Sequence, residues 1–181
     1  IAGSTPYTKA RVFAFDSASA ALSERTPVAS ITGNDFTYTL PALTAAHFVL
    51  ESAPLEAWRQ QYFGTTAGTG AAADTADPDL DGRSNLLEYA LGSVPTAADK
   101  GSPAAAGSVA DGTGTHLTLT FNRIADPALV YTVEASDDLT SWSPIWTSTG
   151  AQNVAGSVVA VDSTVSQQTQ PRRFLRLRVS Y

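Results

Sequence analysis

The sequence predicts a mainly β protein in which antiparallel β-sandwich modules are joined by a short helical linker. Three observations support this prediction. Apolar residues alternate with polar ones near both ends of the 181-residue chain, and this two-residue period is typical of half-buried strands. A segment between these regions has helical spacing, and a tract rich in Gly, Ala and Thr follows it. The composition, 43% hydrophobic and 15% charged, is typical of a globular protein.

Residues 1–52 are predicted to be the closing strands of a β-sandwich domain that begins upstream. Alternation over 9–15 indicates one strand, residues 36–40 a second, and the apolar run 47–50 a third, with turn chemistry at 33–35. So few strands with one apolar face do not close a sandwich core by themselves. We therefore expect further strands upstream of this segment.

Residues 53–100 are predicted to be the helical linker. Leu55, Trp58 and Tyr62 fall on one stripe of a short amphipathic helix. The Gly, Ala and Thr tract at 64–76 offers little surface to bury and is expected to be a flexible connection. A boundary between modules is expected near this tract.

Residues 101–181 are predicted to form a C-terminal antiparallel β-sandwich module. The alternation also places Arg176 and Arg178 on the solvent face of the last strand, because Leu175 and Leu177 take the other face. The expected strands are 117–121, 129–133, 142–146, 158–161 and 174–179.

An acidic stretch at 77–88 matches the calcium loop of an EF-hand at every constrained position. Calcium takes about six to eight oxygen ligands, and Gly82 permits the sharp turn that brings them together. The expected ligands are the carboxylates of Asp77, Asp79 and Asp81, the carbonyl of Arg83, a water held by Asn85, and both carboxylate oxygens of Glu88. The sequence therefore predicts a structural Ca²⁺ site, which makes 53–100 a calcium-loop linker. A solvated acidic turn is the alternative.

The expected role of calcium is that of a folding clamp. Four neighbouring carboxylates repel one another, so the loop is expected to be disordered until an ion neutralises it and a helix forms from Asn85. A regulatory switch would need paired loops and an apolar groove, whereas this chain has one such loop and no Met to line a groove.

Composition excludes several classes of function. The net charge of -6 argues against nucleic-acid binding, and the absence of Cys excludes disulfides and thiol chemistry. No apolar run reaches the roughly 18 to 20 residues of a membrane span. The chain contains no Met, and Ile1–Ala10 lacks the features of a secretion signal, so we expect it to be cut from a longer protein with any export signal upstream.

Paired aromatic residues suggest a possible surface for sugar binding. Trp142 and Trp146 are four residues apart in a predicted strand, which would aim both indoles at one face, with Tyr131 as a neighbour. Core packing is the alternative. His47 and His116 lie in strand contexts without motif residues, so no catalytic residue is predicted, although an acid pair of the glycosidase type stays open.

Part of the first segment resembles a known family of enzymes. The motifs ARVFAF at 10–15 and TYTLPAL at 37–43, running into FVL at 48–50, resemble the closing strands of the small β-domain that follows the barrel in clan-A glycoside hydrolases such as endoglucanases and arabinofuranosidases. The barrel that carries the catalytic glutamates of these enzymes has no counterpart in this sequence. The resemblance therefore implies no catalytic residue in this chain.

The remainder is similar to C-terminal modules of secreted and surface proteins of Verrucomicrobia-type bacteria. The motifs are WRQQYFG at 58–64, NLLEYALG at 85–92 after the acidic loop, and YTVEASDDL at 131–139 with RFLRL at 173–177. The resemblance implies a secreted or cell-surface appendage with a dockerin-like or thrombospondin-repeat-like calcium loop. It implies no reaction.

Together these observations predict a non-catalytic C-terminal accessory region of a secreted bacterial glycoside hydrolase acting on polysaccharide. Its role would be attachment, spacing or stabilisation. Its expected partners are the upstream catalytic domain of the same polypeptide and a polysaccharide or cell surface. Two alternatives remain: a carbohydrate-binding module that uses Trp142, Trp146 and Tyr131, and a part of the hydrolase that completes its active site.

Overall fold

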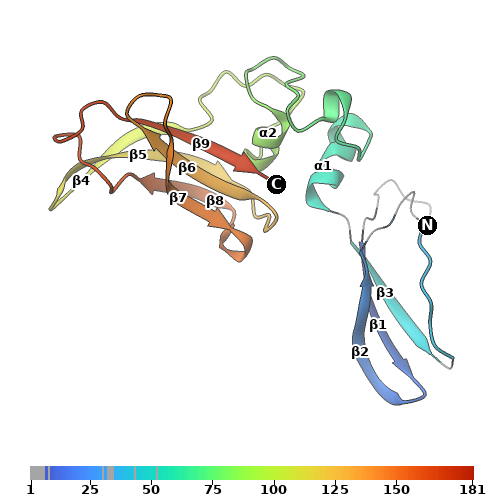
Figure 1. The fold of residues 1–181 in the computed structure, drawn as a ribbon. Helices are drawn as coiled ribbons and strands as arrows, with labels where there is room; N and C mark the ends of the chain where they lie inside the picture. Colours follow the sequence, from blue (N-terminus) through green and yellow to red (C-terminus); the bar gives the residue numbers. More distant parts are fainter. Residues whose placement is uncertain (1–6, 8, 30, 32–34, 43, 52) are drawn as a thin grey trace. The chain divides into compact units, whose positions relative to one another are not determined.

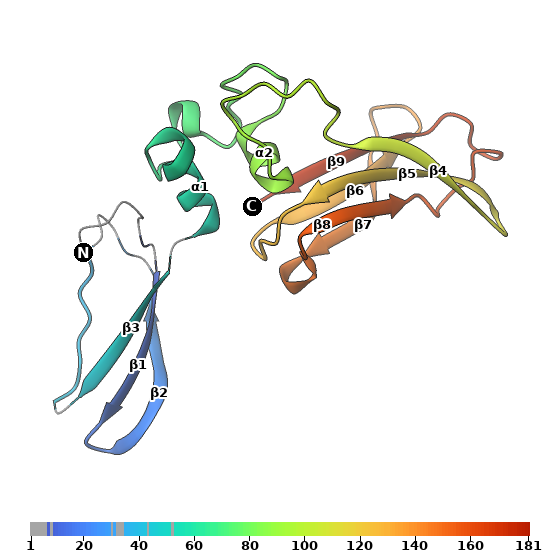
Figure 2. The ribbon, with the colours of Figure 1, turned by 180° about the vertical axis from the view of Figure 1, so that it is seen from behind.

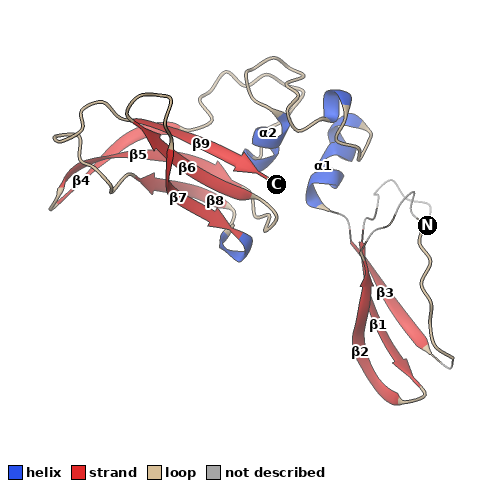
Figure 3. Ribbon diagram, viewed as in Figure 1, coloured by secondary structure: helices blue, strands red, loops and turns tan. Residues whose placement is uncertain are grey.

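The computed structural model describes residues 7, 9–29, 31, 35–42, 44–51 and 53–181 (Figure 1). The protein is mainly β, with antiparallel sheets and few helices, as predicted (Figure 3). Residues 33 and 34 of the turn predicted at 33–35 lie outside the described residues.

The chain divides into two compact units, Ile1–Ala72 and Ala73–Tyr181, and this division differs from the three segments expected from the sequence. The predicted linker is shared between the units. Its first helix belongs to the first unit, whereas the acidic loop and the helix after it belong to the second.

The first unit contains a three-stranded antiparallel sheet. Its strands are β1 (Lys9–Asp16), β2 (Ser19–Val28) and β3 (Ala45–Glu51), in the order β2-β1-β3. One face of the central strand is buried, and its core residues are Ala10, Val12 and Ala14. The strands predicted at 9–15 and 47–50 are thereby confirmed.

The strand predicted at 36–40 is wrong. This segment is not part of a sheet, and the rings of Phe36 and Tyr38 instead pack against Phe48 of β3, with centroids 5.4 and 5.5 Å away. The apolar alternation at 36–40 arises because alternate side chains cover the sheet, although the segment itself is not a strand. The strand that the sequence analysis missed is β2, whose residues are nearly all exposed and so show no apolar period.

Helix α1 (Pro54–Phe63) follows β3 and confirms the predicted helix. Pro54 lies in its first turn, and Gly64 ends it with a φ of 70°, a left-handed conformation that favours glycine. A short 3-10 helix, η1 (Gly70–Ala72), closes the first unit.

The second unit contains one α-helix and six strands in two antiparallel sheets, ordered β4-β5-β8 and β7-β6-β9. Phe121 of the first sheet stacks on Tyr131 of the second at 6.3 Å and contacts Trp146 at 5.9 Å. The ribbons of the two sheets lie beside each other in both views (Figures 1 and 2). The elements are α2 (Asn85–Leu91), β4 (Ala105–Asp111), β5 (Gly114–Arg123), β6 (Val130–Ser136), β7 (Ser143–Thr149), the 3-10 helix η2 (Gly150–Gln152), β8 (Gly156–Val161) and β9 (Phe174–Ser180).

All five strands predicted in this part of the chain are present, and Arg176 and Arg178 of β9 are exposed as expected. The analysis missed β4. Every residue of this strand is exposed, and most are Ala, Gly or Ser, so its sequence reads as a loop.

Among the residues that the structure describes, no helix combines the length and the apolar character that crossing a membrane requires.

Candidate metal centre

The predicted calcium loop lies between η1 and α2, and its three aspartates come together. Oxygen atoms of Asp77, Asp79 and Asp81 all lie within 4.8 Å of one another. Calcium binds oxygen at about 2.3 to 2.6 Å, so two ligands of one ion lie at most about 5 Å apart. The three carboxylates are therefore close enough to share an ion.

Backbone hydrogen bonds shape this loop around the carboxylates. Asp77 accepts from the backbone N–H of Asp81 at 3.2 Å and of Gly82 at 2.9 Å, and Asp79 accepts from that of Asp81 at 3.3 Å. Gly82 has a φ of 91°, which explains why a glycine is needed there. Leu80 also has a positive φ, 61°, which no feature of the sequence indicated, and its side chain is 85% exposed.

Glu88 of α2, the fourth expected carboxylate, is fully buried, but it is not in the group whose oxygens all lie within 4.8 Å of one another. Among the described residues, its Oε2 atom has no hydrogen-bond partner, and neither has the buried Oδ2 atom of Asp79. Burial, together with the charges of Asp79 and Asp81, raises the pKa of Glu88 to about 7. Buried acceptors without partners are costly, and a hard divalent cation would supply the partner they lack. The donor set therefore fits calcium.

Asn85 fixes the start of α2 against the beginning of the second unit. Its backbone N–H donates to the carbonyl of Ala76 at 2.8 Å, and its side-chain Nδ2 donates to that of Ala73 at 2.7 Å. The side chain is almost completely buried. Its expected role of holding a water ligand stays a prediction.

Arg83 was expected to contribute only its backbone carbonyl, but its side chain is also engaged. The guanidinium is buried and contacts Asp81, the side chain and carbonyl of Asp99, and the carbonyl of Gly101. Asp99 and Gly101 are 16 and 18 residues away in the sequence, so no local pattern could have revealed these contacts.

Helix α2 is anchored to the sheets by two tyrosines. The hydroxyl of Tyr89 donates to Asp126 at 2.5 Å, and that of Tyr131 donates to the carbonyl of Ala90 at 2.8 Å. Burial raises the pKa of Tyr131 to about 12. Because Tyr131 is fully buried, its expected role in sugar stacking is wrong.

The expectation that Trp142 and Trp146 share one face is also wrong. Trp146 pairs with Val133 of β6, whereas Pro144 pairs with the next residue, Glu134, so β7 contains an irregularity of the β-bulge type. An extra residue in a strand reverses the facing of side chains on either side of it. Trp142 also precedes the first residue of β7, so the alternation that would aim both indoles at one face does not run unbroken between them.

The contacts of the two indoles differ accordingly. Trp146 lies edge-on to Phe121, with the guanidinium of Arg123 5.7 Å from its ring centroid. Trp142 lies instead under the exposed Arg176, at 4.0 Å. Both indoles are half-buried and Tyr131 is fully buried, so the three residues predicted to bind sugar form no exposed row.

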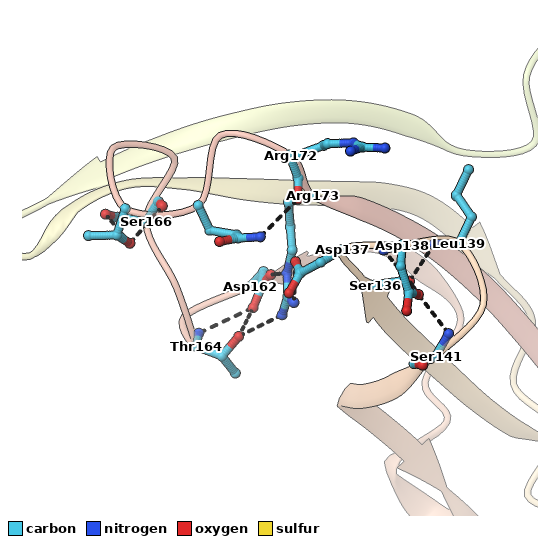
Figure 4. Close-up of polar contacts among 12 residues, drawn as sticks. Ser136, Asp137, Asp138, Leu139, Ser141, Asp162, Thr164, Ser166, Arg172 and Arg173 are labelled. Atoms are coloured by element: carbon cyan, nitrogen blue, oxygen red, sulfur yellow. Dashed lines mark hydrogen bonds and ion pairs between the residues drawn. The ribbon is translucent and has the colours of Figure 1, made fainter.

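A polar cluster that the sequence analysis did not predict joins the loop after β8 to the start of β9 (Figure 4). Arg173 contacts Asp162 at 2.6 Å, Thr164 at 2.8 Å and Asp137 at 3.0 Å. Asp162 is completely buried. Burial alone would raise the pKa of Asp162, but the hydrogen bonds from Arg173 and Thr164 outweigh it and lower the pKa. Each charged side chain in the cluster has an oppositely charged partner, so the cluster has a structural role.

The two histidines lie in separate units. His47 is exposed on β3, and His116 is buried in β5 with acceptors at both ring nitrogens. Its Nδ1 lies 2.9 Å from the carbonyl of Val165, and its Nε2 lies 3.3 Å from Asp111. The Val165 carbonyl, and to a lesser extent the Asp111 carboxylate, raise the pKa of His116 above its usual 6.5. The protonated ring, which donates from both nitrogens, fits this site.

We expect this histidine to make the second unit less stable at alkaline pH. A raised pKa means that the stabilisation is fully present below about 6.5 and is lost as the pH rises through the pKa of the folded state. Asp111, the charged group that faces the ring from β4, stays ionised because its own pKa is lowered. In saturating calcium, the melting temperature should therefore decrease more steeply between about pH 6 and about pH 8 for the unsubstituted chain than for His116→Gln. Parallel curves would contradict this role.

Comparison with known proteins finds that part of the chain is similar to a glycoside hydrolase. It is 40% identical over 52 residues to Endoglucanase A of Paenibacillus lautus. The match covers 29% of this chain and 7% of that enzyme's length. No family model matches the chain, and no solved structure matches it.

Proposed function

We propose that this chain is a calcium-stabilised, non-catalytic accessory region of a secreted bacterial glycoside hydrolase acting on polysaccharide. The similarity of 52 residues to Endoglucanase A is the observation that carries this proposal. The accessory region would serve in attachment, spacing or stabilisation. Its partners would be the catalytic domain of the same polypeptide and a polysaccharide or cell surface.

Calcium is the proposed structural cofactor. The ion would be held by Asp77, Asp79, Asp81 and Glu88, together with the Arg83 carbonyl and a water held by Asn85. The buried, unpartnered oxygens of Asp79 and Glu88 support this assignment. The ion would compensate the negative charge of the loop and clamp α2 to the two sheets, which we propose form an antiparallel sandwich.

The contacts of other buried acids support a non-catalytic role. In the described part of the chain, three buried carboxylates outside the loop each have a structural partner. Asp126 accepts from Tyr89 at 2.5 Å, Asp162 pairs with Arg173 at 2.6 Å, and Glu134 pairs with Arg176 at 2.7 Å. A general acid or base has to reach substrate, whereas these groups are occupied within the fold.

The proposal is tested by incubating the chain with soluble cellulose, mixed-linkage glucan and xylan and measuring reducing ends, with an active endoglucanase as the positive control. We expect no release above buffer. Release that increases with protein concentration would overturn the non-catalytic role. Electrophoresis through gels containing the same polymers then separates the alternatives, because retardation by one polymer favours a carbohydrate-binding module and unchanged mobility favours a spacer or stabilising region.

A further inference from the structure

We propose that the side chain of Arg83 is a positioning residue through which calcium binding orders the chain from Asp99 to the start of β4. This inference rests on the proposed calcium site. It concerns a group that the EF-hand pattern leaves unconstrained, since that pattern uses only the backbone carbonyl at this position. The inference therefore assigns a function to the one basic side chain inside the acidic loop.

The guanidinium of Arg83 connects the acidic loop to the segment 99–101, which follows α2. Its Nη1 lies 3.2 Å from a carboxylate oxygen of Asp99, and its Nη2 donates to the Asp99 carbonyl at 2.9 Å and also to the carbonyl of Gly101. Its Nε lies 3.7 Å from Asp81. The Arg83 side chain is only 6% exposed and that of Asp81 2%, whereas that of Asp99 is 59% exposed. The contact with Asp81 is therefore screened less by water and salt than the contact with the Asp99 carboxylate.

Asp81 is the group that connects this bridge to the ion. One of its carboxylate oxygens accepts from the backbone N–H of Arg83 at 2.9 Å, and the other accepts from that of Asp99 at 3.1 Å. A carboxylate that binds a metal is oriented by the hydrogen bonds that it accepts. The direction in which Asp81 points is therefore set jointly by the loop and by the Asp99 segment.

The same carboxylate is subject to the charge of its neighbours. Oxygen atoms of Asp77, Asp79 and Asp81 all lie within 4.8 Å of one another, so these carboxylates repel one another when no ion is bound. Without a cation this repulsion favours a wider loop, whereas an ion draws the carboxylates together. Asp81 also accepts a hydrogen bond from Asp99, so an ion that fixes Asp81 in place orders the Asp99 segment as well. Because coupling between two sites is reciprocal, an ordered Asp99 segment in turn strengthens ion binding.

The ordered Asp99 segment leads directly into the most exposed strand of the second unit. Asp99 accepts from the backbone N–H of Gly101 at 2.8 Å, which closes a tight turn. A few residues later the chain enters β4, which is exposed at every residue and pairs with β5 alone. An exposed edge strand with few apolar contacts opens locally at low cost. Its start is therefore where an added restraint has the greatest effect.

The arginine fork suits this role better than a lysine would. Arg83 reaches one carboxylate and two carbonyls of the 99–101 segment while it stays beside Asp81. A planar guanidinium carries five donors in fixed directions, whereas an ammonium is a point charge with three. Replacement by lysine would keep the charge but lose the simultaneous contacts.

The test measures amide hydrogen exchange by mass spectrometry for the full chain in saturating calcium and in chelator. In the unsubstituted chain we expect calcium to slow exchange in residues 77–88 and also in 99–107. In Arg83→Met, calcium affinity measured by calorimetry should fall by about 10- to 100-fold, as for other residues that orient a metal ligand. At saturating calcium, protection of 77–88 should return in this variant, whereas protection of 99–107 should not.

Two matched variants make the result specific. Arg11→Met removes the same charge from an exposed pair with Glu24 in the first unit and should leave both segments unchanged. Arg83→Lys keeps the charge, provides a second variant should Arg83→Met fail to fold, and should bind calcium without fully protecting 99–107. Every substitution at position 83 retains the backbone carbonyl, so a loss of affinity is attributable to the side chain.

The outcomes separate this inference from the proposed calcium site. If calcium protects 99–107 in Arg83→Met and Arg83→Lys as well as in the unsubstituted chain, the positioning role is wrong and the calcium site stands. If calcium changes exchange in neither segment of the unsubstituted chain, the calcium site itself is wrong. Protection of 77–88 alone in the unsubstituted chain would overturn only the coupling to β4.

Discussion

Glu88→Gln should abolish most of the stabilisation by calcium and, in chelator, should make the second unit more stable than the unsubstituted chain. The two effects have opposite signs because the same carboxylate is a ligand when the ion is bound and a buried charge when it is not. At a free calcium concentration of about 100 times Kd, an ion that binds only the folded state adds about 2.7 kcal/mol. For a unit of about 100 residues this corresponds to about 10 °C in Tm.

The gain in chelator follows from the contacts of Glu88. Its carboxylate is fully buried beside Asp79 and Asp81, and its Oε2 atom has no hydrogen-bond partner among the described residues. An amide of the same shape carries no charge and can donate to a neighbouring carboxylate. Relieving a buried acceptor without a partner is worth about 1–3 kcal/mol.

Both effects are tested by measuring the melting temperatures of the unsubstituted chain and of Glu88→Gln, each in calcium and in chelator. Glu51→Gln is the control, since it makes the same chemical change at an exposed position at the end of β3. It should melt like the unsubstituted chain under both conditions. A Glu88→Gln variant that keeps the full response to calcium would show that this carboxylate is no ligand.

The sequence predicts those elements of the fold whose side chains alternate between core and solvent. Strand β1 is the clearest example, because Ala10, Val12 and Ala14 are buried while Lys9, Arg11 and Phe15 are exposed. Strands β2 and β4 were not predicted, for the opposite reason. Both are largely exposed, so backbone pairing with a neighbour holds them in the sheet and leaves no apolar period to read.

The candidate site divides in a similar way. The loop is predictable because its ligands are fixed by local spacing, and the structure brings Asp77, Asp79 and Asp81 together as expected. The side-chain contacts of Arg83 and Arg173 were not predictable, because their partners come from other loops of the folded chain. The register irregularity in β7 likewise depends on pairing with β6, and it interrupts the alternation that was expected to place the two tryptophans on one face.

Arg173→Met should lower the free energy of unfolding of the second unit by about 3–5 kcal/mol, the typical result of removing one partner from a buried ion pair. Asp162 is completely buried and would keep only its hydrogen bonds from Thr164. The expected decrease in Tm is on the order of 10–20 °C. The effect should exceed that of any exposed charge, because an unpaired buried carboxylate is the group left behind.

Arg172→Met provides a matched control, because it removes the same charge from the adjacent, exposed residue. Denaturant unfolding in saturating calcium should place this control within about 0.5 kcal/mol of the unsubstituted chain.

The pH dependence identifies Asp162 as the cause. Its pKa is lowered from the usual 3.8, so the pair stabilises the fold above that value and the contribution is lost as the pH falls through the folded-state pKa. The difference between the two variants should therefore shrink in acid. A difference that is absent at neutral pH, or that does not change in acid, would show that the Arg173 cluster is not a buried ion pair on which the fold depends.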